Sequence, residues 1–165
     1  MQTKKGQKGF SLIELLIVVA IIGIIAAIAI PNLLASRRAA NEGSAQSSLR
    51  TIHSAESTYQ STSGNGAFTP TATALATLSG ANLIDSVLGS GTKSGYTFTV
   101  PEVTAPSTGV LAQFAAQASP QVTSGPSQSG TRVFGITEDG VMRGEASLAA
   151  KTTRAEVIAM TPLGN

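Results

Sequence analysis

Glu14 is the single charged residue in an apolar stretch that runs from Phe10 to Ile30. At about 1.5 Å per residue, a helix of this length spans roughly the 30 Å hydrocarbon core of a bilayer, so the segment is long enough to cross a membrane. A charged side chain there costs about 2.5 to 3.5 kcal/mol on insertion scales. A glutamate at this position therefore indicates a function that needs a partner for the carboxylate.

The residues around Glu14 resemble the start of a type IV pilin or pseudopilin precursor. A short basic leader, residues 1–9, ends at Gly9, and the long apolar helix that follows it closes at Pro31. The resemblance implies that a membrane peptidase cuts between Gly9 and Phe10 and that the new amine of Phe10 is methylated. It also implies that the chains assemble into a helical filament in which Glu14 sets the register.

The chemistry of the cut explains why a glutamate is placed there. The new amine of Phe10 carries a positive charge below its pKa of about 7.7 to 8.0. It lies four residues before Glu14, on the same face of a helix. In the filament, the resemblance implies an ion pair between Glu14 of an incoming chain and the Phe10 amine of its neighbour. Any other axial offset between the two chains leaves both charges unpaired in a medium of low dielectric constant.

Three other interpretations of the apolar stretch remain open. A secretory signal peptide also has a basic start and an apolar core, and residues 27–29, Ala-Ile-Ala, supply a small-x-small pattern, but this stretch is longer than the usual core of about 7 to 15 residues. A plain signal anchor explains the length and leaves Glu14 and the Gly9–Phe10 junction without a role. A buried helix of a soluble protein does not require the unbroken apolar run 15–30.

Two residues of the expected helix favour a kink or local melting. Pro31 removes a backbone hydrogen bond and clashes with the preceding turn, and Gly23 costs about 1 kcal/mol in helix propensity. The pilin resemblance implies that the stretch between them can unwind when a fibre is pulled.

Beyond Pro31, apolar residues recur every three or four positions to about residue 60. This spacing predicts a helix that packs one apolar stripe on a globular domain. The residues of the stripe are Ala45, Leu49, Ile52, Ala55 or Glu56, and Tyr59.

The rest of the chain reads as a small mixed domain. Leucines between residues 75 and 88 predict short helical turns. Alternating residues at 96–100 and 110–114 predict two strands, and residues 133–142 predict a hairpin around Asp139-Gly140. Residues 119–130 form an expected surface loop, and the tail after Glu145 has no assigned structure. The stretches 94–98 and 130–143 also resemble pilins that lack cysteines.

These elements predict an α+β pilin fold. Its long N-terminal helix has a first half in the membrane or filament core and a second half packed on an antiparallel sheet of about four strands. The expected divisions are the leader at 1–9, the transmembrane and assembly helix at 10–31, the amphipathic half of the helix at 32–60 and the globular head at 61–165. The chain has no cysteine, so packing and hydrogen bonds alone must hold its C-terminal region.

Charge and composition offer little support for catalysis or nucleic-acid binding. The leader carries three of the eleven basic residues, and its removal leaves eight basic side chains against nine acidic ones, a net charge of −1. The basic character of the precursor is therefore a property of the leader. His53 is the only histidine. We expect no catalytic residue, cofactor or metal, and nucleic-acid binding through scattered arginines is a minor possibility.

The expected function is that of a structural subunit of an extracellular type IV pilus, serving adhesion, twitching motility or DNA uptake. Its partners would be further copies of the chain, the prepilin peptidase, and an inner-membrane assembly platform driven by an ATPase. The precursor would cross the inner membrane once with its N-terminus in the cytoplasm, and the assembled form would lie on the cell surface. A pseudopilin of a type II secretion system is the alternative, and a membrane-anchored binding domain is a third possibility.

Overall fold

The computed structural model describes residues 9–164. The leader lysines Lys4, Lys5 and Lys8 lie outside the described residues. Contacts between Cα atoms divide the chain into two compact units with a boundary between Ser36 and Arg37. The first unit holds the beginning of helix α1, Leu12–Thr62, and the second holds the remainder of α1 and all the strands.

In the first unit, the surface of α1 is apolar on all sides. The large apolar side chains from Phe10 to Leu33 are 48% to 83% exposed, and by length and composition the helix is able to cross a membrane. An apolar surface of this kind is stable only inside a bilayer or against other apolar chains.

The helix continues through Gly23 and Pro31, and the side-chain amide of Asn32 donates to the Ile28 carbonyl at 3.1 Å. Melting of this stretch stays a prediction.

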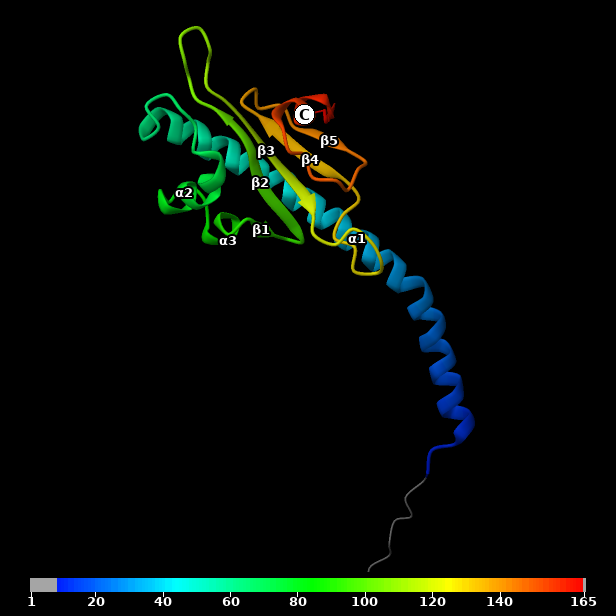
Figure 1. The fold of residues 1–165 in the computed structure, drawn as a ribbon. Helices are drawn as coiled ribbons and strands as arrows, with labels where there is room; N and C mark the ends of the chain where they lie inside the picture. Colours follow the sequence, from blue (N-terminus) through cyan, green and yellow to red (C-terminus); the bar gives the residue numbers. More distant parts are fainter. Residues whose placement is uncertain (1–8, 165) are drawn as a thin grey trace, which may run out of the picture. The chain divides into compact units, whose positions relative to one another are not determined.

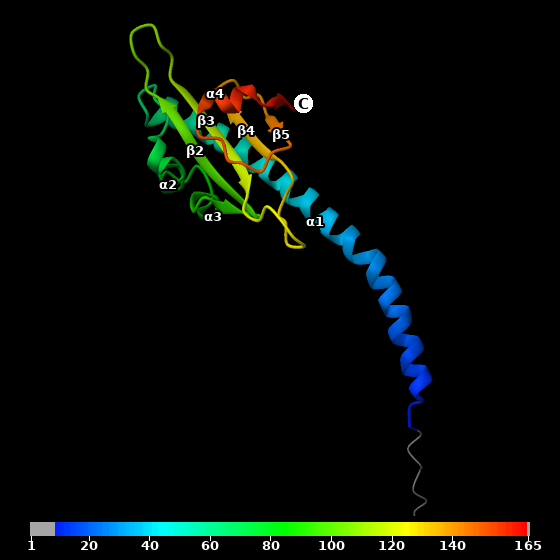
Figure 2. The same ribbon diagram turned by 45° about the vertical axis from the view of Figure 1, so that its right-hand side comes forward.

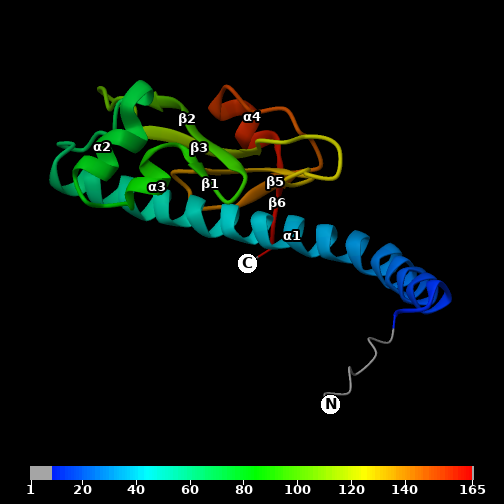
Figure 3. The same ribbon diagram turned by 90° about the horizontal axis from the view of Figure 1, so that it is seen from below.

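In the second unit, α1 lies along one face of a sheet (Figures 1 and 3). The predicted stripe is confirmed, because Ala45, Leu49 and Ile52 are completely buried and belong to the main hydrophobic core. Glu56 is also completely buried, and the partly buried Tyr59 packs against the core. The helical period therefore predicted which side of α1 faces the domain.

The sheet has six antiparallel strands in the order of the sequence, and the α+β pilin fold is confirmed. The sequence predicted about four strands, because the outermost two contain two residues each and are too short to show an alternating pattern. The strands are β1 Thr92–Lys93, β2 Tyr96–Thr104, β3 Gln113–Pro120, β4 Val133–Thr137, β5 Arg143–Glu145 and β6 Thr161–Pro162. The hairpin of β4 and β5 is present, although β5 begins at Arg143, just beyond the predicted residues.

Short helices cover the parts of the sheet that α1 leaves open. The leucine-rich region forms a 3-10 turn, Thr71–Thr73, followed by α2, Ala74–Gly80, and α3, Ser86–Gly89. The C-terminal tail forms α4, Arg154–Ala159. Val157 and Met160 pack with Ala115 and Val133 in a second cluster, on the face of the sheet opposite α1 (Figures 2 and 3). The second unit thus has three layers, with the sheet in the middle.

Candidate functional site

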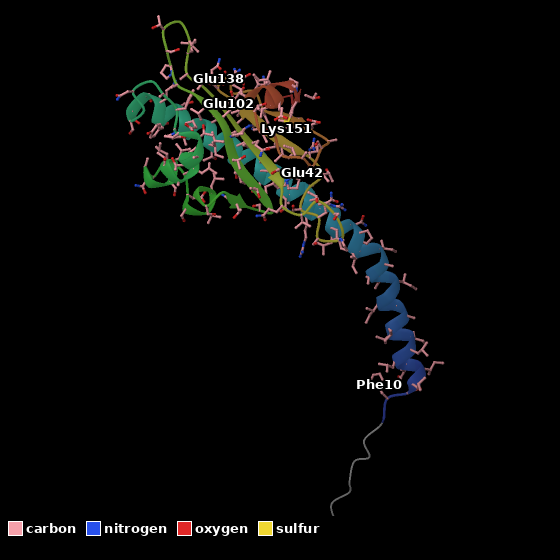
Figure 4. All side chains as sticks on the ribbon, in the orientation of Figure 1. Phe10, Glu42, Glu102, Glu138 and Lys151 are labelled. Carbon is pink, nitrogen blue, oxygen red and sulfur yellow. The ribbon has the colours of Figure 1, made fainter. Side chains whose placement is uncertain are left out.

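The predicted cleavage junction is open to its surroundings. Phe10 precedes α1 (Figure 4) and is 83% exposed. A Cβ atom added to Gly9 would meet no atom within 4 Å. Packing among the described residues therefore does not require a glycine at position 9.

The carboxylate of Glu14 folds back over the first turn of α1. Its Oε2 atom accepts a hydrogen bond from the main-chain N–H of Ser11 at 3.1 Å. Ser11 immediately precedes the helix, so this contact is one half of a capping box, in which the third helical residue bonds the N-cap N–H. This capping role of Glu14 was not predicted from the sequence. The signal was present, since Ser11 stands three positions before Glu14 at the start of an apolar run.

This geometry leaves the Glu14 carboxylate able to take a further partner. An ionised carboxylate offers about four lone-pair positions, and the Ser11 N–H occupies one. The N-terminus of a helix also stabilises a negative charge. Glu14 is therefore held near the Phe10 junction by the helix cap, with acceptor capacity left for a cation from outside the chain. The register role of Glu14 stays a prediction.

Further along α1, Glu42 connects the helix to the loop before β4. Its Oε1 accepts from the N–H of Thr131 at 2.8 Å and from the Thr131 hydroxyl at 2.7 Å. Its Oε2 accepts from Arg132 Nε and Nη2, each at 3.0 Å. Burial alone raises the pKa of Glu42, but the hydrogen bonds from Thr131 and Arg132 outweigh it and lower the pKa overall.

The neighbouring Tyr96 brings together the two stretches that resemble cysteine-free pilins. Its ring is completely buried, and its hydroxyl donates to the Arg132 carbonyl at 3.0 Å. A Cβ on Gly130 would lie 1.9 Å from the Tyr96 hydroxyl oxygen, so a side chain at position 130 would displace the ring. Burial and the nearby Glu42 carboxylate raise the pKa of Tyr96. The stretches 94–98 and 130–143 thus meet at the point where β2 approaches α1.

Glu56 makes a similar connection farther along the same helix. Its carboxylate accepts from the N–H of Thr69 at 3.0 Å and also from the Thr69 hydroxyl. Burial raises the pKa of Glu56, and the two bonds from Thr69 only partly oppose that effect. Within residues 9–164, no ion pair involves Glu56.

Ion pairs and hydrogen bonds hold the cysteine-free C-terminal region. Arg154, at the start of α4, pairs with Glu138, and its main-chain N–H donates to Glu102 Oε2 at 2.6 Å. Figure 4 shows the positions of Glu102 and Glu138. The N–H of Lys151 donates to the buried Gln117 at 2.9 Å. The tail that had no assigned structure is therefore fixed to strands β2 and β3 and to the end of β4.

The single histidine packs against the head. The ring centroid of His53 lies 5.9 Å from that of Phe114, and Nε2 is 3.5 Å from the Glu138 carbonyl oxygen. Across the described part of the chain, no group of three or more acidic or histidine side chains has an arrangement that could hold a metal ion. The packing of His53 against Phe114 was not predicted from the sequence.

Comparisons with known proteins match the N-terminal part of the chain. Residues 4–30 match the model of the prokaryotic N-terminal methylation motif. The chain is 66% identical over 38 residues to a type IV wide pilus major component of Thermus thermophilus, covering 23% of this chain and 29% of that protein. It is 46% identical over 52 residues to a type IV major pilin protein of Myxococcus xanthus, covering 32% of this chain and 24% of that protein.

A third relative, a fimbrial protein of Pseudomonas aeruginosa, is 82% identical over 28 residues, which is 17% of this chain and 18% of the relative. The chain thus matches less than a third of the length of these curated relatives. No solved structure matches it. The resemblance to type IV pilins at the N-terminus is confirmed: the apolar segment that contains Glu14 carries the methylation motif of prepilin-like proteins.

Proposed function

We propose that the chain is a structural subunit of an extracellular type IV pilus. The observation that carries the proposal is the position of Glu14, the lone charge of an exposed apolar helix, five residues after Gly9 and inside the matched methylation motif. The pilus names of the relatives support the same function. In this role the chain has structural work to do and no reaction to catalyse.

The proposed life cycle has three steps. The precursor crosses the inner membrane once, with its leader in the cytoplasm. A prepilin peptidase cuts between Gly9 and Phe10, and the amine of Phe10 is methylated. An ATPase-driven platform in the membrane then adds the chain to a filament, where the apolar part of α1 leaves the lipid for the apolar parts of neighbouring chains. The exposed surface of this helix is apolar enough for both environments.

Intact mass spectrometry of surface fibres tests this proposal. Fibres sheared from cells should contain this chain as the main component, beginning at Phe10 with one added methyl group. Chains that retain residues 1–9 in assembled fibres would contradict the proposed processing. A pseudopilin of a secretion system should instead be missing from sheared fibres at native expression while its loss blocks secretion.

A further inference from the structure

Most basic side chains of the second unit have a partner inside the chain. Residues 37–165 contain eight basic residues. Five of them form ion pairs, namely Lys93, Arg132, Arg143, Lys151 and Arg154. Arg38 donates from Nη1 to Gln128 Oε1 at 3.0 Å. Arg37 and Arg50 are exposed, and within residues 9–164 neither side chain takes part in a hydrogen bond or an ion pair. These two arginines are therefore open to partners outside the chain.

Arg37 differs from Arg50 in its place along α1. The part of α1 in the first unit runs from Leu12 to Ser36 and is roughly 37 Å long at about 1.5 Å per residue. That length exceeds the hydrocarbon core of a bilayer, roughly 30 Å, and stays below its full thickness of about 40 to 45 Å. When this part fills the core, the next residue, Arg37, is at the depth of the headgroups. Arg50 follows thirteen positions later, about 20 Å along a helix, which is too far to reach the same headgroups.

The headgroup layer offers a ligand that suits an exposed arginine. Every phospholipid headgroup contains a phosphate, and a planar guanidinium donates two parallel N–H bonds to phosphate oxygens. At the end of an apolar helix, the long side chain reaches this layer while its methylene stem stays against the acyl chains. Acidic side chains nearby in sequence do not compete, because residues 15–41 contain no Asp or Glu. The carboxylate of Glu42 is itself held by Thr131 and Arg132.

We infer that Arg37 binds the phosphate of an anionic phospholipid headgroup, on the side of the membrane where the second unit lies. The inference rests on the membrane-inserted state of the proposed function and names the lipid that this state contacts. One arginine near an anionic lipid surface corresponds to about a fivefold preference for the anionic lipid, which is about 1 kcal/mol. The contact holds the inserted helix at the surface of the bilayer until assembly removes the helix from the lipid.

Fluorescence quenching in vesicles tests the contact, because the chain has no tryptophan of its own. Leu33→Trp places a probe at an exposed position, four residues before Arg37 and on the same side of the helix. The full chain with this probe is reconstituted in vesicles of phosphatidylcholine and phosphatidylglycerol. Bromine is placed on the acyl chains of one lipid or the other, at the same fraction. Brominated phosphatidylglycerol should quench the probe more strongly, by a ratio that corresponds to about a fivefold local enrichment of the anionic lipid.

Arg50→Gln is the matched control, since it removes the same charge from another exposed position that has no side-chain partner among the described residues. Arg37→Gln should remove most of the enrichment, whereas Arg50→Gln should leave it unchanged. Neither substitution removes a contact among residues 9–164, so both variants should keep the circular dichroism of the Leu33→Trp protein. Inorganic phosphate should weaken the enrichment no more than sodium chloride does at the same ionic strength. A stronger effect of phosphate would indicate a site for the free ion and overturn the inference.

The remaining outcomes separate the lipid contact from the proposed function. Equal enrichment in the Leu33→Trp protein and in its Arg37→Gln variant would overturn the inference and leave the pilus function intact. Equal losses in Arg37→Gln and Arg50→Gln would also overturn it, because a general effect of net charge would then explain both. Absence of quenching by either lipid would show that the segment does not enter the bilayer, and it would overturn both the inference and the proposed life cycle. The expected enrichment in vesicles, together with cells that lack fibres of this chain, would overturn the pilus function alone.

Discussion

Glu42 and Glu56 lie fourteen positions apart on α1, and each accepts the main-chain N–H and the hydroxyl of one threonine, Thr131 and Thr69 respectively. Fourteen residues are close to four helical turns, so both carboxylates leave the same side of the helix. They differ in charge balance, because Glu42 also pairs with Arg132. Burial is the largest influence on both groups and raises the pKa of each. At Glu42 the hydrogen bonds from Thr131 and Arg132 outweigh burial, so its pKa is lowered, whereas at Glu56 burial prevails and the pKa is raised.

This difference predicts a loss of stability for Glu42→Gln at neutral pH. A carboxylate whose pKa is lowered by folding stabilises the protein above its ordinary value of 4.5 and loses that effect as the pH falls. The amide keeps an acceptor for Thr131 but loses the ion pair with the half-exposed Arg132. We expect the free energy of unfolding at pH 7 to fall by about 1 to 2 kcal/mol. Urea unfolding of the full chain in detergent at several pH values measures it, and a difference from wild type that grows below pH 4 would contradict the prediction.

Glu56→Gln should behave in the opposite way. A carboxylate whose pKa is raised by folding favours the folded state fully below pH 4.5, and that contribution is lost as the pH rises through the folded pKa. The amide can still accept from Thr69 and carries no buried charge. The variant should therefore be at least as stable as wild type at pH 7, with a smaller loss of stability between pH 4.5 and pH 7. Urea unfolding of the Glu56→Gln variant at several pH values checks this prediction. A marked loss of stability confined to neutral pH would show that the charged form of Glu56 is needed.

The sequence could predict the side of α1 that is buried and could not predict these two contacts. Apolar side chains at Ala45, Leu49 and Ile52 follow the helical period, which is a local signal. The partner of Glu42 lies 89 positions away, and only the finished fold brings the two together. The same limit applies to the short strands at both ends of the sheet, which owe their pairing to their neighbours. The methylation motif around Glu14 could be recognised because its residues are close in sequence, and the roles of Gly9, Phe10 and Glu14 stay predictions.

A chain that begins at Arg37 should fold without the apolar segment. The second compact unit starts at this residue, and it contains the main core, the sheet and both glutamate–threonine contacts. We expect a soluble protein whose circular dichroism and thermal unfolding are insensitive to reductant, because there is no disulfide to reduce. An unfolded spectrum at neutral pH would show that residues before Arg37 are needed to form the domain.

Gly9 should be required for processing and dispensable for folding. Among residues 9–164 the added Cβ meets no atom within 4 Å beyond its chain neighbours, so Gly9→Leu should insert in the membrane normally and accumulate as the uncut precursor. Gly23→Ala provides a matched control inside the helix, where an added Cβ also meets nothing. It should be processed, and it should stabilise the helix by about 1 kcal/mol. Immunoblots of membrane fractions separate the two lengths, and normal cutting of Gly9→Leu would rule out this junction as the cleavage site.

Substitutions at Glu14 separate its two roles, the helix cap and the charge. Glu14→Ala removes both, whereas Glu14→Gln keeps an acceptor for the Ser11 N–H, as the capping box allows either residue. Both variants should insert more easily, since a buried charge is gone, and both should still be cut after Gly9. If the charge sets the register, both should lose filament assembly, because the Phe10 amine of each neighbour is left without a counter-charge, a cost of about 3 to 5 kcal/mol.

Ser11→Ala is the control that keeps the carboxylate of Glu14 and its main-chain hydrogen bond while removing only the serine hydroxyl. It should assemble at close to the normal level. Electron microscopy and the yield of sheared fibres compare the three variants against equal amounts of processed chain. Fibres at normal yield from Glu14→Gln would mean that the acceptor and not the charge is needed. Fibres at normal yield from Glu14→Ala would remove the physical argument for a register carboxylate, because a processed and anchored chain would then polymerise with no charge in its apolar helix.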